Sequence, residues 1–494
     1  MPPPKIKRRT FLGYLFISFA LIRCKKDPIA IQKPSPNPIS VINPPPIGPT
    51  SDYMGQYTIT EIGSKLVVPD PTFNQSINGY TDQVSYNIGD TVTVYLSGPA
   101  NNDAVIPLLD TRRNTILSVS TPIATQTIKS TKPWVDGFMY DKTFSFKIPE
   151  YFKSGVYTWN KLIPFTIKGN KTSYDLTVVY PTNTANAYNF AGGKSVYAPD
   201  FNNRATVLSF LRSNTIMPAA FFQWIDNQTY NINYIADCDL DDYSQIQNSK
   251  VVVITGHSEY WTRQARENID KFVDSGKNVL MLSGNLMWWQ VRYNKEKSAM
   301  ICYKDVNGYS NYDNTIDPLG TTKYSTVNWG TPVVDYPILP SIGTDYRYGG
   351  YGNQLPNRWN GFKIVQEDSP ILKGSGLKNG DILNMPTTEY EGTPVVELFP
   401  PGSPKIPVID NSVLNFHQVE LLGFDFASNS QRRDNLGFGT FMVCQKSSTS
   451  GTIVHGASMD WCSNILLDNG KIKTITKNMI DLSLSDRSLF TPKK

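Results

Sequence analysis

Two continuous apolar runs, separated by an amphipathic stretch, constrain the fold of this chain more than any other feature. Residues 250–255 (KVVVIT) and 278–282 (NVLML) are typical of strands buried on both faces, as in a parallel sheet. Between them, residues 262–275 repeat apolar side chains at helical spacing, and Gly276 follows as a stop signal. The apolar helical positions are Ala265, Ile269, Phe272 and Val273. A strand, a helix and a strand in this order form a βαβ unit, which predicts an α/β domain.

The same domain extends over residues 173–494 by its pattern of strands, helices and loops. We expect further strands at 176–180, 230–236 and 451–454, and helices at 204–212 and 473–484. Residues 300–360 are rich in Tyr, Asn, Gly and Pro and predict long loops folded over the sheet, including the segment 346–352. The predicted fold is an α/β parallel-sheet domain of the glutamine-amidotransferase-like kind.

Residues 53–172 show a second pattern, of short alternating runs between turn signals. The predicted strands are 83–86, 91–96, 143–148, 156–159 and 164–167. Strands at this spacing indicate an all-β immunoglobulin-like sandwich ahead of the α/β domain. The segment has no His and no Cys, so we expect a structural or interface role for it.

The charge of the chain is concentrated at its start. The formal charge is +5, from 47 Lys and Arg against 42 Asp and Glu, and residues 1–23 hold five of the basic residues and no acidic one. The rest of the chain is therefore formally neutral, which argues against nucleic acid as a partner.

Residues 1–24 resemble an export leader, with a basic start and an apolar run too short to span a bilayer. Arg8-Arg9 begins a twin-arginine-like motif, and residues 21–24 resemble a lipobox in which Cys24 would carry a lipid; the alternative is an ordinary signal peptide with an incidental cysteine. Residues 25–52 form a proline-rich linker, which favours an extended chain. We expect an exported protein, in the periplasm or at the outer cell surface, held to a membrane by its lipid anchor.

Polar side chains follow the two buried strands at their carboxyl ends, where α/β sheets bind ligands. His257 and Glu259 come after the first strand and Asn285 after the second. Residues i and i+2 of an extended segment point the same way, so His257 and Glu259 can converge on one ligand, metal or water, with the Asn285 amide in reach. The alternative is that His257 and Glu259 cap the following helix.

Several familiar catalytic arrangements are missing from the sequence. No Gly-x-Ser-x-Gly elbow, Cys-x-x-Cys pair or phosphate-binding glycine loop is present. The cysteines outside the leader are Cys238, Cys302, Cys444 and Cys462, and they could form disulfides in an oxidising compartment with a pairing that spacing does not fix. Metal- or acid/base-assisted chemistry built from His, Glu, Asn and Tyr remains.

Five segments together resemble the large (beta) subunit family of N,N-dimethylformamidase, over roughly residues 174–480. They are PTNTANAYNFAGGKSVY (181–197), VVVITGHSEYWTRQAR (251–266), LSGNLMWWQVR (282–292), TEYEG (388–392) and GASMDWC (456–462). The resemblance implies a hydrolase of a small amide with a mononuclear Fe(III) site. Carried over by motif, the implied iron ligands are Tyr188, Tyr197 and Glu259. The implied assisting residues are His257, Asn285 and the general base Glu389, with Glu391 as the alternative base.

Two other functions stay open on the sequence alone. The chain could be a non-catalytic surface lipoprotein that binds glycan or another polymer by stacking on Trp288, Trp289 and the 346–352 segment. It could also be a carbohydrate-active hydrolase that uses two carboxylates, one of them Glu259. Assembly of identical chains is compatible with each of these hypotheses.

Overall fold

The computed structural model describes most of the chain after the linker. The described residues are 58–59, 64–67, 74–199, 203–213, 219–304, 317–320, 322–399, 402–429 and 436–493. The predicted leader and linker lie outside them. Within the described ranges, no helix combines the length and the apolar character needed to cross a membrane.

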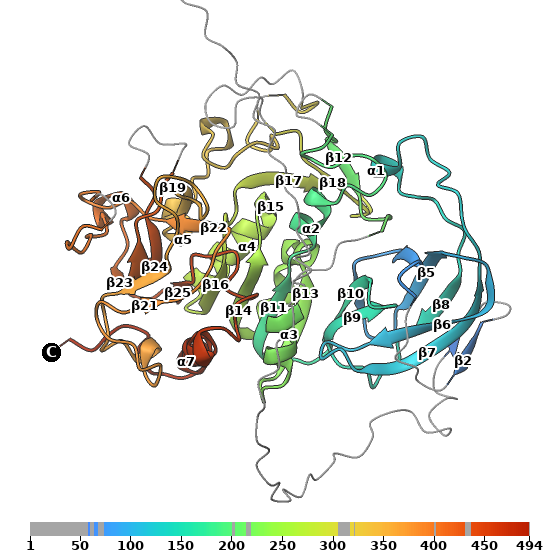
Figure 1. Cartoon of the computed structure of the whole chain (residues 1–494), viewed down its shortest axis with the longest axis horizontal. Coiled ribbons are helices and arrows are strands. Elements are labelled where there is room, and N and C mark those ends of the chain that lie inside the picture. Colours follow the sequence, from blue (N-terminus) through green and yellow to red (C-terminus); the bar gives the residue numbers. More distant parts are fainter. Residues whose placement is uncertain are drawn as a thin grey trace, which may run out of the picture. The chain divides into compact units, whose positions relative to one another are not determined.

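Two β-sheets packed on one core form the amino-terminal part (Figure 1). The four-stranded sheet has the order β1 (Thr58–Ile59), β8 (Phe144–Lys147), β5 (Thr91–Ser97), β3 (Asn78–Thr81). The six-stranded sheet has the order β2 (Lys65–Val67), β7 (Thr115–Ile123), β6 (Asn101–Leu109), β9 (Gly155–Trp159), β10 (Ile163–Lys168), β4 (Ser85–Asn87). Alternate residues of β5 are buried, and the apolar residues of β5 and β7, such as Val92 and Val119, share one core cluster with Trp159, as a sandwich requires. The β6–β7 hairpin was not predicted, because β6 begins with three polar residues and contains Pro107.

The central sheet of the second part is mixed, with a parallel section of five strands. This section has the order β13 (Ile232–Ala236), β11 (Tyr174–Tyr180), β14 (Ser249–His257), β16 (Asn278–Gly284), β25 (Thr452–His455). Antiparallel strands extend it in the order β24 (Gly439–Gln445), β23 (Gln418–Asp425), β20 (Phe362–Ile364), β21 (Ile382–Leu383). The predicted parallel strands are thus present, while the described part of the chain is β-rich, with mixed sheets and few helices.

Helices cover both faces of the parallel section because its strands are apolar on both sides. Val252 and Ile254 of β14 pack in one cluster with the apolar stripe of α4 (Arg263–Asp274). Val251 and Val253 pack on the other face, in a cluster that contains α7 (Lys471–Ser483). Each such side chain contributes roughly 1.5–3 kcal/mol on full burial. The shorter helices are α1 (Pro133–Asp136), α2 (Thr182–Tyr188), α3 (Ala219–Asp226), α5 (Leu339–Ile342) and α6 (Asn411–Leu414).

Two predicted elements differ in the structure. The helix expected at 204–212 is wrong: the segment contains the strand β12 (Val207–Ser209), which pairs with β18 (Ala299–Ile301) in a small sheet with β17 (Trp289–Tyr293) and β15 (Tyr260–Thr262). Its apolar residues do not share a face, since Leu208 and Leu211 pack in different clusters. The loop expected at 346–352 is largely the strand β19 (Asp345–Tyr351), which pairs with β22 (Glu389–Gly392).

The cysteines of the described part are unpaired. Cys238, Cys302, Cys444 and Cys462 are all free and buried, so the disulfides considered from the sequence do not form. Burial raises the pKa of the Cys302 and Cys462 thiols to about 12, which keeps both groups protonated and unreactive.

His455, at the end of β25, is a buried core histidine. Its Nε2 lies 2.6 Å from the carbonyl oxygen of Ile342 and its Nδ1 lies 3.3 Å from the hydroxyl of Thr344. The neutral ring therefore donates from Nε2 and accepts at Nδ1. Burial lowers the pKa of His455 to about 4, so charging this side chain opposes folding.

This burial predicts an acid-sensitive component of stability. An unfolded histidine has a pKa of about 6.5, so the contribution of His455 is complete above that pH and is lost as the pH falls toward 4, on the order of 3 kcal/mol in total. Urea unfolding at pH 7 and pH 5 should show a smaller loss of free energy in His455→Asn than in the unaltered protein. His417→Asn, at an exposed position, is the control. Equal losses in all three proteins would contradict the assignment.

Candidate functional site

The carboxylate of Glu259 is the centre of a buried polar cluster. Its side chain follows β14, and the residue is 2% exposed. Tyr188 donates from its hydroxyl to Oε2 at 2.9 Å, and Tyr197 donates to Oε1 at 3.0 Å. The indole Nε1 of Trp289 donates to Oε1 at 2.9 Å. Three donors from three separate segments thus compensate one buried carboxylate.

A second carboxylate, that of Glu389, completes the cluster. The Nε2 atom of His257 lies 3.2 Å from Oε2 of Glu389 and 3.5 Å from Oε2 of Glu259, so the imidazole bridges the two acids. The side-chain amide of Asn285 donates to Oε2 of Glu389 at 3.0 Å. The structure therefore brings together all six residues singled out from the sequence, within one connected set of contacts.

The carboxyl ends of β14 and β16 position His257, Glu259 and Asn285. β14 and β16 run parallel, with His257 opposite Gly284, so the residues that follow them emerge at the same edge. Asn285 has a φ of 49°, a left-handed conformation that asparagine tolerates better than most residues. A Cβ on Gly284 would lie 2.8 Å from the backbone oxygen of Glu389, so only glycine lets β22 pass this closely.

Tyr188 and Tyr197 lie on α2 and on the irregular segment that follows it. Tyr188 is the last residue of α2, and Tyr197 lies nine residues further on, outside any helix or strand. Their rings stack with centroids 4.6 Å apart. The two residues are 38% and 41% exposed, although their hydroxyls bond the buried Glu259. The phenol oxygens therefore point inward, and the rings form part of the outer surface of the site.

Three further residues complete the surroundings, and none of them was expected at this cluster from the sequence: Trp289 was considered only as a stacking platform for a polymer. The Tyr260 hydroxyl lies 2.5 Å from that of Tyr197. Trp289 holds Glu259, as described. Lys304, only 3% exposed, places its Nζ 3.5 Å from the ring centroid of Tyr197 and 4.6 Å from that of Trp289. Tyr260 and Trp289 lie inside the quoted motifs, whereas no sequence signal marks Lys304.

Burial and neighbouring charges perturb the titrating groups of the cluster. Burial, and then the charge of Glu259, raises the pKa of Tyr188 and Tyr197 well above the usual phenol value. Burial also raises the pKa of Glu259, partly offset by His257 and Lys304. For His257, burial lowers the pKa, but the carboxylates of Glu389 and Glu259 outweigh it and the net shift is upward. The metal-free cluster is thus a network of neutral phenols around acids and a histidine that favours its charged form.

Glu391 occupies a different environment from Glu389, although both lie on β22. Glu391 is 0% exposed and accepts a hydrogen bond from the backbone N–H of Leu286. Burial raises the pKa of Glu391 well above its usual value. Only Glu389 contacts His257 and Asn285, so the geometry favours Glu389 over Glu391 as a base.

The helix-capping alternative for His257 and Glu259 is wrong. The residue that caps α4 is Thr262, whose side chain accepts from the backbone N–H of Ala265. Most aromatic rings of the stacking platform considered for a polymer-binding protein are also not free to stack, although Tyr351 of the same segment is 38% exposed. Trp288, Trp289 and Tyr346 are 4%, 8% and 2% exposed, because they pack in one apolar cluster.

The donor set of this cluster can be tested against a metal ion. Among the residues that the structure describes, no group of three or more His, Cys, Asp or Glu side chains is arranged to hold a metal. Any ion here would therefore need the phenols as ligands. The oxygens of Tyr188 and Tyr197 lie 2.9–3.3 Å from those of Glu259, so the three side chains bring their oxygens together. Phenol and carboxylate oxygens are hard donors that suit Fe(III), so the residues present fit this ion.

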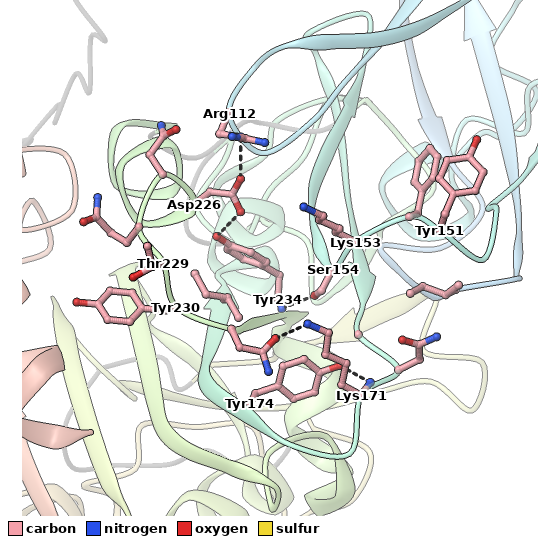
Figure 2. A pocket seen from close by; sticks show the side chains of 18 of the residues that line it. Arg112, Tyr151, Lys153, Ser154, Lys171, Tyr174, Asp226, Thr229, Tyr230 and Tyr234 are labelled. Atoms are coloured by element: carbon pink, nitrogen blue, oxygen red, sulfur yellow. Dashed lines mark hydrogen bonds and ion pairs between the residues drawn. The ribbon is translucent and has the colours of Figure 1, made fainter. Parts of the chain in front are cut away.

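A separate cavity of about 700 Å³ lies away from these residues (Figure 2). It is bounded by the sandwich and by the segment between α3 and β13. Its polar groups bond one another: Arg112 pairs with Asp226 at 3.2 Å, and Tyr234 donates to the same carboxylate at 3.1 Å. None of the six cluster residues lines this cavity, so it does not serve the site.

The protein combines a β-sandwich with a mixed sheet that carries an oxygen-rich side-chain cluster at the carboxyl ends of its parallel strands. The family model described as "N,N-dimethylformamidase beta subunit-like, C-terminal" matches residues 109–472. The chain belongs to this family, and the match begins inside the sandwich. No curated protein matches the sequence. A solved structure of a ThuA-like protein from Bacteroides uniformis is 11% identical, with 66% of this chain and 97% of that one covered and a TM-score of 0.29, too low to support a conclusion about fold.

The buried state of Glu391 yields a stability prediction. Burial raises the pKa of Glu391 and so disfavours its charged form. Glu391→Gln should therefore change the free energy of unfolding by less than about 1 kcal/mol, since the amide oxygen can still accept from Leu286. Glu391→Ala should cost about 2–4 kcal/mol through a cavity and an unpaired N–H. Urea unfolding measures both variants, and equal losses would show that the carboxyl group is needed in its charged form.

Proposed function

We propose that this chain hydrolyses the C–N bond of a small amide at a mononuclear Fe(III) site held by Tyr188, Tyr197 and Glu259. One observation carries the proposal: two phenol oxygens lie within 3.3 Å of one buried carboxylate, in a chain of the N,N-dimethylformamidase beta subunit-like family. We also propose that the parallel section of the central sheet has a glutamine-amidotransferase-like fold.

In this proposal, different side chains of the protein act in different steps of the hydrolysis. Bound at these oxygens, the ion would polarise the amide carbonyl and lower the pKa of a water molecule. Glu389 takes the proton of the attacking water at Oε2, the atom that His257 and Asn285 hold. His257, whose pKa is raised by the two carboxylates, supplies a proton toward the departing amine. The Asn285 amide fixes the direction of the base and lies beside the developing oxyanion.

The iron site is tested by metal content and colour. Protein loaded with iron should hold about one ion per chain and show a visible tyrosinate-to-iron charge-transfer band, because phenolate ligands bind the ion. Tyr188→Phe and Tyr197→Phe should each weaken or shift the band, and Glu259→Ala should lose the iron. Tyr230→Phe, whose hydroxyl bonds Asp481, is the matched control and should keep both properties. A colourless, iron-free unaltered protein would refute the site, as would a metal-free Glu259→Ala with full activity. Glycan binding that survives chelation and loss of His257 would favour the polymer-binding alternative.

The role of the base is tested at Glu389. Glu389→Gln keeps the shape and the contact with Asn285 but cannot take a proton, so kcat toward formamides and acetamides should fall roughly 10²- to 10⁴-fold. Iron content and the visible band should be unchanged, because Glu389 is not among the proposed ligands. Glu391→Gln is the control on the same strand and should keep near-normal activity. A reversed pattern, with Glu391→Gln inactive and Glu389→Gln active, would move the base to Glu391.

We also propose that the chain is exported and held to a membrane through Cys24. The support is the sequence alone: the basic start, the short apolar run, the lipobox-like residues 21–24 and the proline-rich linker. Transit of a folded protein through a twin-arginine route would allow iron to be loaded before export.

A further inference from the structure

Arg212 uses every hydrogen-bond donor that a guanidinium has. Its Nε donates to the carbonyl of Ser209 at 2.9 Å, and Nη1 donates to the carbonyls of Ala191 and Lys194 at 2.8 and 3.1 Å. Nη2 donates to the backbone oxygen and the Oδ1 atom of Asn186 at 3.0 and 2.9 Å. Five N–H groups thus meet five oxygens, and none of those oxygens belongs to a carboxylate.

A cation in this position is costly for the fold. Arg212 is 0% exposed, and burial lowers its pKa to about 10, so the side chain stays charged at neutral pH. A buried charge that is neutralised by dipoles alone loses more hydration than each single bond returns. Only the complete set of five bonds makes the position tolerable.

Four of these five bonds reach one short segment, residues 186–194. This segment holds Tyr188 and leads into Tyr197. The backbone closes back on itself there, since Val196 donates its N–H to the carbonyl of Ala187 at 3.1 Å. Asn189 adds a bond from its side-chain amide to the carbonyl of Ser213, next to the arginine. These bonds hold the chain on both sides of Tyr188, and the Val196–Ala187 bond ties the approach to Tyr197 to the same segment.

We infer that Arg212 is a positioning residue that sets the two tyrosines in their metal-binding arrangement before any ion is present. The inference rests on the proposed iron site for its purpose, while the bonds themselves join Arg212 to the protein alone. Its action is geometric: none of the five bonds reaches a phenol, and four of them reach the segment that carries Tyr188 and leads into Tyr197.

The chain offers a matched control in Arg266 of α4. Arg266 is also 0% exposed, also donates to backbone carbonyls, those of Tyr336 and Pro337, and also has its pKa lowered to about 10 by burial. It packs on Trp329 and Tyr336, in a cluster that contains neither tyrosine ligand. A merely structural role for Arg212 would make Arg212→Lys and Arg266→Lys behave alike.

The test compares these two variants by hydrogen exchange and by iron binding. Lysine keeps the charge but has only three donors, which cannot reach five oxygens in a plane. In metal-free Arg212→Lys, the amides of residues 186–197 should exchange at least about tenfold faster than in the unaltered protein. Iron should bind about 10- to 100-fold more weakly, with a shifted charge-transfer band. Arg266→Lys should leave the exchange of 186–197, the affinity and the band unchanged.

The outcomes separate the two proposals. If the unaltered protein binds no iron, the proposed function fails, and exchange in the metal-free chain still decides whether Arg212 holds the segment. If iron binds normally and Arg212→Lys changes neither exchange nor affinity, the inference is overturned and the proposed function stands. Should Arg212→Lys not fold, Asn186→Ala removes one of the five acceptors and should change the same quantities in the same direction, more weakly.

Discussion

The burial of the Glu259 carboxylate is the interaction on which the rest of the site depends. A carboxylate removed from water must be met by donors, and here they come from α2, from the segment around Tyr197 and from β17, with the His257 imidazole nearby. β17 is far in the chain from α2 and the Tyr197 segment, which are neighbours. The hydrogen bonds to Glu259 therefore connect the segment that follows β11 of the central sheet to the small sheet that contains β17.

The same arrangement explains why the cluster suits a cation. Without one, each phenol must remain protonated to donate to Glu259, and burial raises the pKa of the phenols and of the acid alike. Every one of these shifts marks a charge that the fold does not fully compensate. A trivalent ion among the three oxygens would reverse the balance, since the phenolate and carboxylate forms would then be favoured. A cation at these oxygens is thus compatible with the cluster, while the proposed iron site rests on the family and on the geometry of the three side chains.

The local parts of the fold were predictable from sequence, and the non-local parts were not. The βαβ unit follows from KVVVIT, the amphipathic stretch 262–275 and NVLML, because each has a strong period of its own, and β14, α4 and β16 lie where that pattern indicates. The helix predicted at 204–212 does not form, because the apolar residues of this segment pack in two different clusters, which no local pattern reveals. The antiparallel extension of the sheet by β24, β23 and β20 was not predicted, because strand pairing depends on contacts across the chain.

In the site, too, the residues that follow regular strands could be predicted from the residue pattern, whereas the tyrosines could not. Glu259, His257 and Asn285 follow directly from strand ends, where a regular element aims the side chain, and physics alone places them together. The tyrosines sit on a seven-residue helix and an irregular segment, and so short a helix does not hold its own geometry in water. Their identification needed the family motifs, and their orientation needs an external support. Arg212 provides that support from outside the motif, with four bonds to backbone oxygens that any residue could offer and one to the side chain of Asn186. Such a position leaves little sequence pattern, because most of the partners of the arginine are set by the conformation of the chain.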